Sequence, residues 1–139
     1  MKNSFKFLCL TLICMLSFSC QSEDDGNNDL TEENEAKIIG TWRFQSSTTD
    51  GVTDTDNDPC LNMLTIMFTS TQVTTNDVYG NNCDMSETYI NAYSINGNTI
   101  TITDEGETYD SEIRTLNATT LTIEDTDDGI IYTETYLKQ

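Results

Sequence analysis

The sequence predicts an all-β domain, an up-and-down antiparallel β-barrel of about eight strands, from three observations. From Lys37 onward, apolar residues alternate with polar ones, which is typical of half-buried strands. In the same part of the chain no segment of useful length shows helical periodicity, and proline occurs only at Pro59. Turn signals rich in Gly, Asn and Asp separate the alternating segments. Consecutive antiparallel strands of this number close into a barrel, which removes exposed edges; a two-sheet β-sandwich is the alternative.

The N-terminal segment, residues 1–19, has the pattern of an export signal peptide. Lys2 and Lys6 precede an apolar stretch at residues 7–16, which is too short to span a bilayer as a stable helix. Ser19 then precedes Cys20, and this pair resembles the lipobox of bacterial lipoproteins. The resemblance implies cleavage before Cys20, lipid on its thiol and anchoring in a membrane. An ordinary signal peptide cleaved near the same place is the alternative.

Residues 20–36 are predicted to form an acidic, flexible tether. The segment is polar and nearly devoid of apolar residues, so it cannot bury enough surface to order itself. Its acidic run Glu23-Asp24-Asp25, just after Cys20, resembles the surface-export signal of Bacteroidetes lipoproteins. The resemblance implies an outer-membrane lipoprotein at the cell surface. A solvated linker with no export role is the alternative.

Residues 37–139 hold the strands of the expected barrel. Ile38, Trp42 and Phe44 share one face of the first strand, and a long acidic connection, residues 46–59, follows it. Asn96-Gly97-Asn98 is a tight-turn signal, because Asn and Gly tolerate positive φ. The expected strands are, in chain order, residues 38–44, 64–69, 73–75, 87–95, 99–104, 109–116, 121–123 and 130–138.

The cysteines agree with an exported protein. Cys9 and Cys14 lie in the expected signal peptide and would be removed with it, and the thiol of Cys20 would carry the lipid. Cys60 and Cys83 remain, an even pair in an oxidising compartment, so we expect a disulfide between them. A two-Cys metal site is the alternative, but it lacks other soft ligands.

The start of the domain resembles a known family. Gly40-Thr41-Trp42 resembles the Gly-x-Trp motif of lipocalins, in which the Trp plugs the closed end of the barrel. Residues 58–60 ahead of the strand at 64–68, together with residues 94–102, extend the resemblance to the small lipocalin-like domains of Bacteroidetes surface lipoproteins. It covers residues 37–139 and implies a cation over the Trp, either Lys138 or Arg114.

Composition excludes several classes of function. Residues 20–139 carry 24 acidic and four basic residues, a formal side-chain charge of −20. Nucleic-acid backbones need a positive partner, so we expect no nucleic-acid binding. The chain has no His, so Ser–His–Asp and Cys–His nucleophiles and His-ligated zinc sites cannot form. We therefore expect no enzyme activity and no cofactor.

The remaining expectation is non-catalytic binding, either of a small apolar ligand or of another surface component. The alternative is a structural or accessory surface module whose barrel is filled by its own side chains, with protein partners that the sequence does not identify. Inward aromatic residues would line a ligand cavity, or simply form the core. These candidates are Trp42, Phe44, Phe68, Tyr89, Tyr93, Tyr109, Tyr132 and Tyr136.

Two groups of acidic residues need separate interpretation. Asp54, Asp56 and Asp58 place hard oxygens within reach of one cation, which suits calcium, but Pro59 and Thr65 replace the Gly and Glu that a calcium loop needs. We favour a solvated acidic loop without metal. Glu134 is in phase with Tyr132 and Tyr136; if these tyrosines face inward, Glu134 is a carboxylate inside the barrel. The opposite phase of the strand makes it a surface residue.

Overall fold

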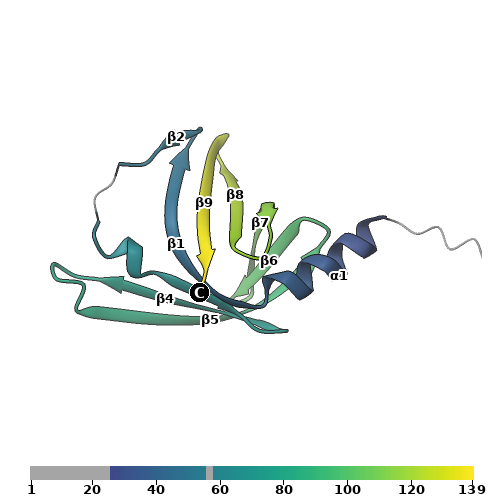
Figure 1. Ribbon diagram of the computed structural model, residues 1–139, viewed down its shortest axis with the longest axis horizontal. Helices are drawn as coiled ribbons and strands as arrows, with labels where there is room; N and C mark the ends of the chain where they lie inside the picture. The colour runs from purple at the N-terminus through teal and green to yellow at the C-terminus, as the bar shows by residue number, and fades with distance from the viewer. Residues whose placement is uncertain (1–25, 56–57) are drawn as a thin grey trace, which may run out of the picture.

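The computed structural model describes residues 26–55 and 58–139, which form one helix followed by a single closed sheet (Figure 1). No helix in this part of the chain is both long enough and apolar enough to cross a membrane. The elements are, in order, α1 (Gly26–Ile38), β1 (Gly40–Thr49), β2 (Val52–Thr53), the 3₁₀ helix η1 (Leu61–Met63), β3 (Thr65–Phe68), β4 (Gln72–Tyr79), β5 (Met85–Asn96), β6 (Thr99–Asp104), β7 (Glu107–Leu116), β8 (Thr120–Asp127) and β9 (Ile130–Lys138).

The sheet confirms the predicted barrel. Strands β3 to β9 pair with their sequence neighbours, all antiparallel, and β1 pairs with both β3 and β9, which closes the ring. Strand β2 has two residues and pairs only with the end of β1, so eight strands make up the barrel. The β-sandwich alternative is wrong because the β1–β9 pairing leaves one closed sheet.

The pairing of β1 is divided between two neighbours. Its first half, Gly40 to Arg43, pairs with β3, whereas β9 pairs along β1 from Trp42 to Thr49. A register shift between Phe44 and Ser46 bends β1 at this division. Strand β3 is short, and the long β4–β5 hairpin projects past it (Figure 1). The two halves of β1 therefore have different neighbours on the β3 side.

Trp42 closes one end of the barrel. Its side chain is fully buried, and its indole Nε1 donates to the carbonyl oxygen of Ile38 at 2.7 Å. Lys138 Nζ lies 4.8 Å from the centre of the Trp42 ring and donates to the carbonyl oxygen of Lys37 at 3.1 Å. Gly40 has φ +133°, and a Cβ there would lie 2.9 Å from Lys138 Cε. Only glycine fits where β1 passes this lysine.

The cation over Trp42 is thus Lys138 and not Arg114. Arg114 on β7 donates to Glu112 Oε1 at 2.8 Å and to Glu124 Oε1 at 2.5 Å. Its guanidinium therefore pairs with carboxylates on β7 and β8.

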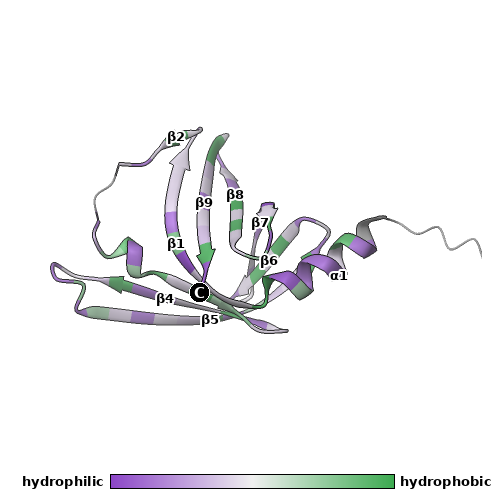
Figure 2. Cartoon of the chain, in the orientation of Figure 1, coloured by the Kyte–Doolittle hydropathy of each residue, from purple (hydrophilic) through white to green (hydrophobic). Residues whose placement is uncertain are grey.

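Inward residues of the strands make the core, and Figure 2 shows hydrophobic colour alternating with hydrophilic colour along β8. Phe44 packs edge-on against Tyr136, with ring centroids 5.8 Å apart, and Phe68 packs in the same way against Tyr93 at 5.1 Å. The buried core consists of Ile38, Trp42, Phe44, Ile66, Phe68, Val73, Ile95, Ile100, Ile113, Leu121 and Tyr136.

Helix α1 differs from the expected flexible tether at residues 20–36. From Gly26 the chain is helical, and the helix docks on the β5–β6 turn. Asn34, 5 % exposed, donates through Nδ2 to the Gly97 carbonyl at 2.9 Å and to Asn98 Oδ1 at 3.2 Å. Thr31 Oγ1 accepts from the Gly97 amide at 2.6 Å. The expectation was wrong here because polar side chains, not apolar ones, make the contact; residues 20–25 lie outside the described residues.

The disulfide between Cys60 and Cys83 is present, as predicted, with the two Cα atoms 5.3 Å apart. It joins the segment before η1 to the turn between β4 and β5. Bridging residues separated by 23 positions should stabilise the fold by about 3 kcal/mol in the chain-entropy picture. The bond holds the projecting hairpin to the connection that follows β2.

The docking of α1 can be tested by Asn34→Ala. This change leaves the Gly97 carbonyl without its buried donor, so we expect the free energy of unfolding to fall by about 2 kcal/mol. Urea unfolding followed by the fluorescence of Trp42, the single tryptophan, measures it. The control Glu32→Ala, at an exposed position of α1, should change stability far less. Equal stability of both variants and the wild type would contradict the docked helix.

Candidate functional site

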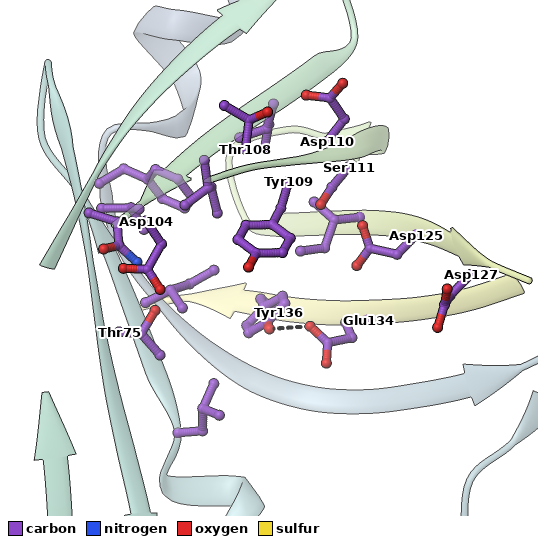
Figure 3. A pocket seen from close by; sticks show the side chains of 18 of the residues that line it. Thr75, Asp104, Thr108, Tyr109, Asp110, Ser111, Asp125, Asp127, Glu134 and Tyr136 are labelled. Carbon is purple, nitrogen blue, oxygen red and sulfur yellow. Dashed lines mark hydrogen bonds between the residues drawn. The ribbon is translucent and has the colours of Figure 1, made fainter. Parts of the chain in front are cut away.

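A cavity of about 830 Å³ occupies the inside of the barrel beyond its core. Residues of all strands from β3 to β9, and Leu64 just before β3, line it. Figure 3 shows side chains from several of these strands projecting into one space. The apolar part of the lining consists of Leu64, Ile66, Phe68, Val73, Ile100, Ile102, Ile123 and Tyr136. The cavity is large enough for a small ligand, and its floor is the top of the hydrophobic core.

The inward row of each strand changes from apolar to acidic along its length. On β6, Ile100 and Ile102 are followed in phase by Asp104. On β8, Leu121 and Ile123 are followed by Asp125 and Asp127. Because side chains alternate along a strand, all of these point to the inner face. The acids stand beyond the core residues, so the cavity has an apolar floor and an acidic rim.

On strand β9 the inward row also changes from a buried core residue to an acidic residue. Tyr136 is 4 % exposed, and its hydroxyl donates to Glu134 Oε2 at 2.5 Å (Figure 3). Burial, and then the negative charge of Glu134 and this hydrogen bond, raise the pKa of the Tyr136 hydroxyl well above its ordinary value. Both residues line the cavity, so the phase that places Glu134 inside is the one adopted. The tyrosine hydroxyl holds this carboxylate at the boundary between floor and rim.

Tyr109 provides an aromatic surface at the rim. Its ring points into the cavity between the strands that carry Asp104 and Asp125 (Figure 3). It is 54 % exposed, and its hydroxyl donates to Glu107 Oε2 at 2.9 Å. This hydrogen bond and the charge of Glu107 raise the pKa of Tyr109. The exposed ring is available to a ligand that enters the cavity.

The structure separates the eight aromatic candidates into three groups. Phe68, Tyr109 and Tyr136 line the cavity. Trp42 and Phe44 are buried in the core and do not line it. The others lie elsewhere: Tyr93 is at a shallow pocket beside α1, with its hydroxyl donating to Thr69 O at 2.6 Å, and Tyr89 and Tyr132 are exposed at 46 % and 39 %.

Sequence reasoning missed most of the lining. It selected aromatic residues, whereas the floor is mainly aliphatic and the rim acidic. The signal was present in the alternation itself, because extending the inward rows of β6 and β8 toward their next turns reaches Asp104, Asp125 and Asp127. Asp110 borders the cavity, but its side chain lies on the outer face of the sheet, where it accepts a hydrogen bond from Thr101 Oγ1 at 2.6 Å.

The acidic connection after β1 is not part of the cavity. Asp54 Oδ1 accepts from Thr49 Oγ1 at 2.9 Å, and Asp58 Oδ1 accepts from the Cys60 amide at 2.9 Å. Asp56 lies outside the described residues. Within residues 26–55 and 58–139, no three acidic or cysteine side chains come close enough together to hold a metal ion. The two described aspartates act in local turns.

The pair of Tyr136 and Glu134 gives a pH dependence. A tyrosine with a raised pKa keeps its proton in the folded state while the unfolded chain releases it, so stability falls as the pH rises above 10. Relative to Tyr136→Phe, the wild type should lose about 1.4 kcal/mol of unfolding free energy per pH unit above this point. Urea unfolding of both proteins between about pH 9 and about pH 11 measures the difference. If the unfolding free energies of the wild type and of Tyr136→Phe changed in parallel with pH, the raised pKa of Tyr136 would be contradicted.

Comparisons with known proteins agree with this architecture. The family described as "Lipocalin-like domain" matches residues 38–123. A lipocalin-like protein from Bacteroides uniformis ATCC 8492 has a similar structure, with a TM-score of 0.57 and 13 % identity, covering 74 % of this chain and 99 % of that one.

A second structure, an uncharacterized protein from Bacteroides eggerthii DSM 20697, gives a TM-score of 0.54 at 12 % identity and covers 73 % of this chain and 99 % of that one. At these identities the likeness shows the fold alone. No curated protein matches the chain. Because the family match covers more than half of the sequence, the chain belongs to the lipocalin-like domain family.

Proposed function

We propose that this lipocalin-like domain binds a small ligand with an apolar body inside its barrel, without catalysis, on a lipid-anchored protein of the outer membrane. The cavity of about 830 Å³ carries the proposal. A structural or accessory module, the alternative, needs a barrel filled by its own side chains. The space beyond Phe68, Ile100 and Tyr136 favours the binding function.

The position of the cavity also supports ligand binding. The Trp42 end is closed by core packing and by α1, so a ligand enters from the opposite end. The aliphatic floor offers apolar surface to the ligand body, and burial of each methylene group contributes about 0.8 kcal/mol. Rigid strands, not loops, carry the lining, so the site is preformed.

The chemistry of the lining favours binding over catalysis. The chain has no His, and Cys60 and Cys83 are joined in the disulfide. General acid–base catalysis would need carboxylates such as Glu134, and Glu134 Oε2 already accepts a hydrogen bond from the Tyr136 hydroxyl. We therefore propose that the cavity binds its ligand without catalysing a reaction.

The anchor and the location rest on the sequence. The leader, residues 1–19, and Cys20 lie outside the described residues, so the lipobox resemblance is their support. The acidic run Glu23-Asp24-Asp25 supports placement on the cell surface. The domain would then present its cavity to the medium or to another surface component.

Cavity binding can be tested with N-phenyl-1-naphthylamine, a neutral apolar fluorophore. We expect saturable binding of one molecule per chain, with enhanced fluorescence. The filling variant Ile102→Trp places a large ring in the cavity from β6 and should weaken binding at least about tenfold. Thr75→Trp fills the same space from β4.

The matched control is Thr103→Trp, which adds the same ring on the exposed side of β6. It should bind the fluorophore as the wild type does. Melting curves show which variants remain folded. An absence of binding by the wild type, or equal binding by both folded filling variants, would contradict the proposed function.

The anchor can be tested by Cys20→Ala. Metabolic labelling with a radioactive fatty acid should mark the wild type and the control Cys14→Ala, but not Cys20→Ala. The reason is that Cys9 and Cys14 follow large apolar residues, whereas Cys20 follows a serine. Persistent labelling of Cys20→Ala would refute attachment at this residue.

A further inference from the structure

We propose that the ligand of this cavity is a cationic amphiphile: an apolar body for the floor and an amine or ammonium head for the rim. The inference rests on the proposed binding function and assigns it a ligand class. It follows from how charge is distributed over the lining, which the apolar floor alone does not determine.

Four carboxylates from three strands point into the cavity. They are Asp104 on β6, Asp125 and Asp127 on β8, and Glu134 on β9. None of the residues that line the cavity is Lys or Arg. Among the described residues, no salt bridge involves any of the four. Their negative charge is therefore not neutralised by a side chain of the described chain.

Three of the four basic residues in the described part of the chain have partners elsewhere. Lys37 pairs with Glu33 on α1, Arg114 pairs with Glu112 and Glu124, and Lys138 lies over Trp42 at the closed end. None of them lines the cavity. The protein thus places its attraction for cations at the mouth of the barrel and keeps these positive groups away from it.

The change from apolar to acidic residues along the strands indicates which end of the ligand carries the positive charge. Going from the closed end outward, the rows read Ile100, Ile102, Asp104 on β6 and Tyr136, Glu134 on β9. An apolar chain placed against the isoleucines therefore has its outer end beside carboxylates. The exposed ring of Tyr109 lies opposite Ile102 in the β6–β7 register, with its hydroxyl on Glu107, and adds an aromatic face that attracts a cationic head.

A bare metal ion fits this arrangement less well. Within the described residues no three acidic side chains converge closely enough to chelate one ion. Carboxylates spread around a rim attract a diffuse organic cation, which needs no fixed coordination geometry. The aliphatic floor would have no role in binding an ion, whereas it holds the body of an amphiphile.

The test compares three ligands with the same alkyl body: decylamine, decanol and decanoate. Calorimetric titration of the purified protein at neutral pH and low ionic strength, below the micelle concentration of each ligand, gives three affinities. We expect decylamine to bind about tenfold more tightly than decanol, and decanoate to bind most weakly. High salt should reduce the difference between amine and alcohol, because the rim is open to solvent.

The variant Asp125→Asn combined with Glu134→Gln removes two rim charges while keeping side-chain size and the acceptor for the Tyr136 hydroxyl. It should reduce the preference for decylamine over decanol severalfold and leave decanol affinity unchanged. The control Asp29→Asn with Glu35→Gln removes the same charge from exposed positions of α1. It should keep the preference, which separates a local effect from attraction by the net charge of the chain.

The outcomes distinguish the two proposals. Binding of decanol with no preference for decylamine in the wild type would overturn the ligand class and leave the cavity as a binding site. A preference reduced equally by the rim and control variants would also overturn it, because attraction would then come from the whole chain. Failure of all three ligands to bind would overturn the proposed function, and the ligand class with it.

Discussion

The structure depends on the contact between Trp42 and the C-terminal end of α1. The indole donates to the Ile38 carbonyl, and Lys138 covers the ring while donating to the Lys37 carbonyl. These two carbonyls lack partners inside the helix, because a helix leaves its last carbonyls unpaired. One buried side chain therefore fixes the end of the helix, the first strand and the last strand together. Its position also accounts for Gly40, since φ there is +133°, which side-chain-bearing residues rarely adopt, and a Cβ would lie 2.9 Å from Lys138 Cε.

Closure at this end determines where the cavity lies. Core residues fill the barrel near Trp42, and the strands continue past them. Strand β3 is short and the β4–β5 hairpin is long, so the far end lacks a complete ring of equal strands. The disulfide Cys60–Cys83 holds the hairpin to the connection opposite it. A barrel that is packed at one end and extended at the other leaves a cavity above the core that opens at the extended end.

Most of the fold was predictable from the sequence, and the cavity was only partly so. Alternation and the turn at Asn96-Gly97-Asn98 located the strands, because strand period and turn chemistry are local properties. The docking of α1 was missed because Asn34 acts through hydrogen bonds, which leave no apolar pattern. Whether the barrel is filled depends on strand lengths and the β1–β9 register, which are properties of the assembled sheet. Tyr89 is in phase with inward residues yet exposed, because its hairpin extends past the barrel.

The acidic rim has an energetic consequence for the empty protein. Carboxylates gathered around one opening repel one another, and this repulsion opposes the compact state. In the described chain, Glu134 accepts a hydrogen bond from the Tyr136 hydroxyl, so part of the cost is offset by a neutral donor that leaves the negative charge in place. A lysine or arginine at the rim would relieve the repulsion more fully, but it would also cancel the field at the opening. A ligand that brings positive charge gains from the repulsion that it relieves, so binding and folding stability are coupled through the same carboxylates.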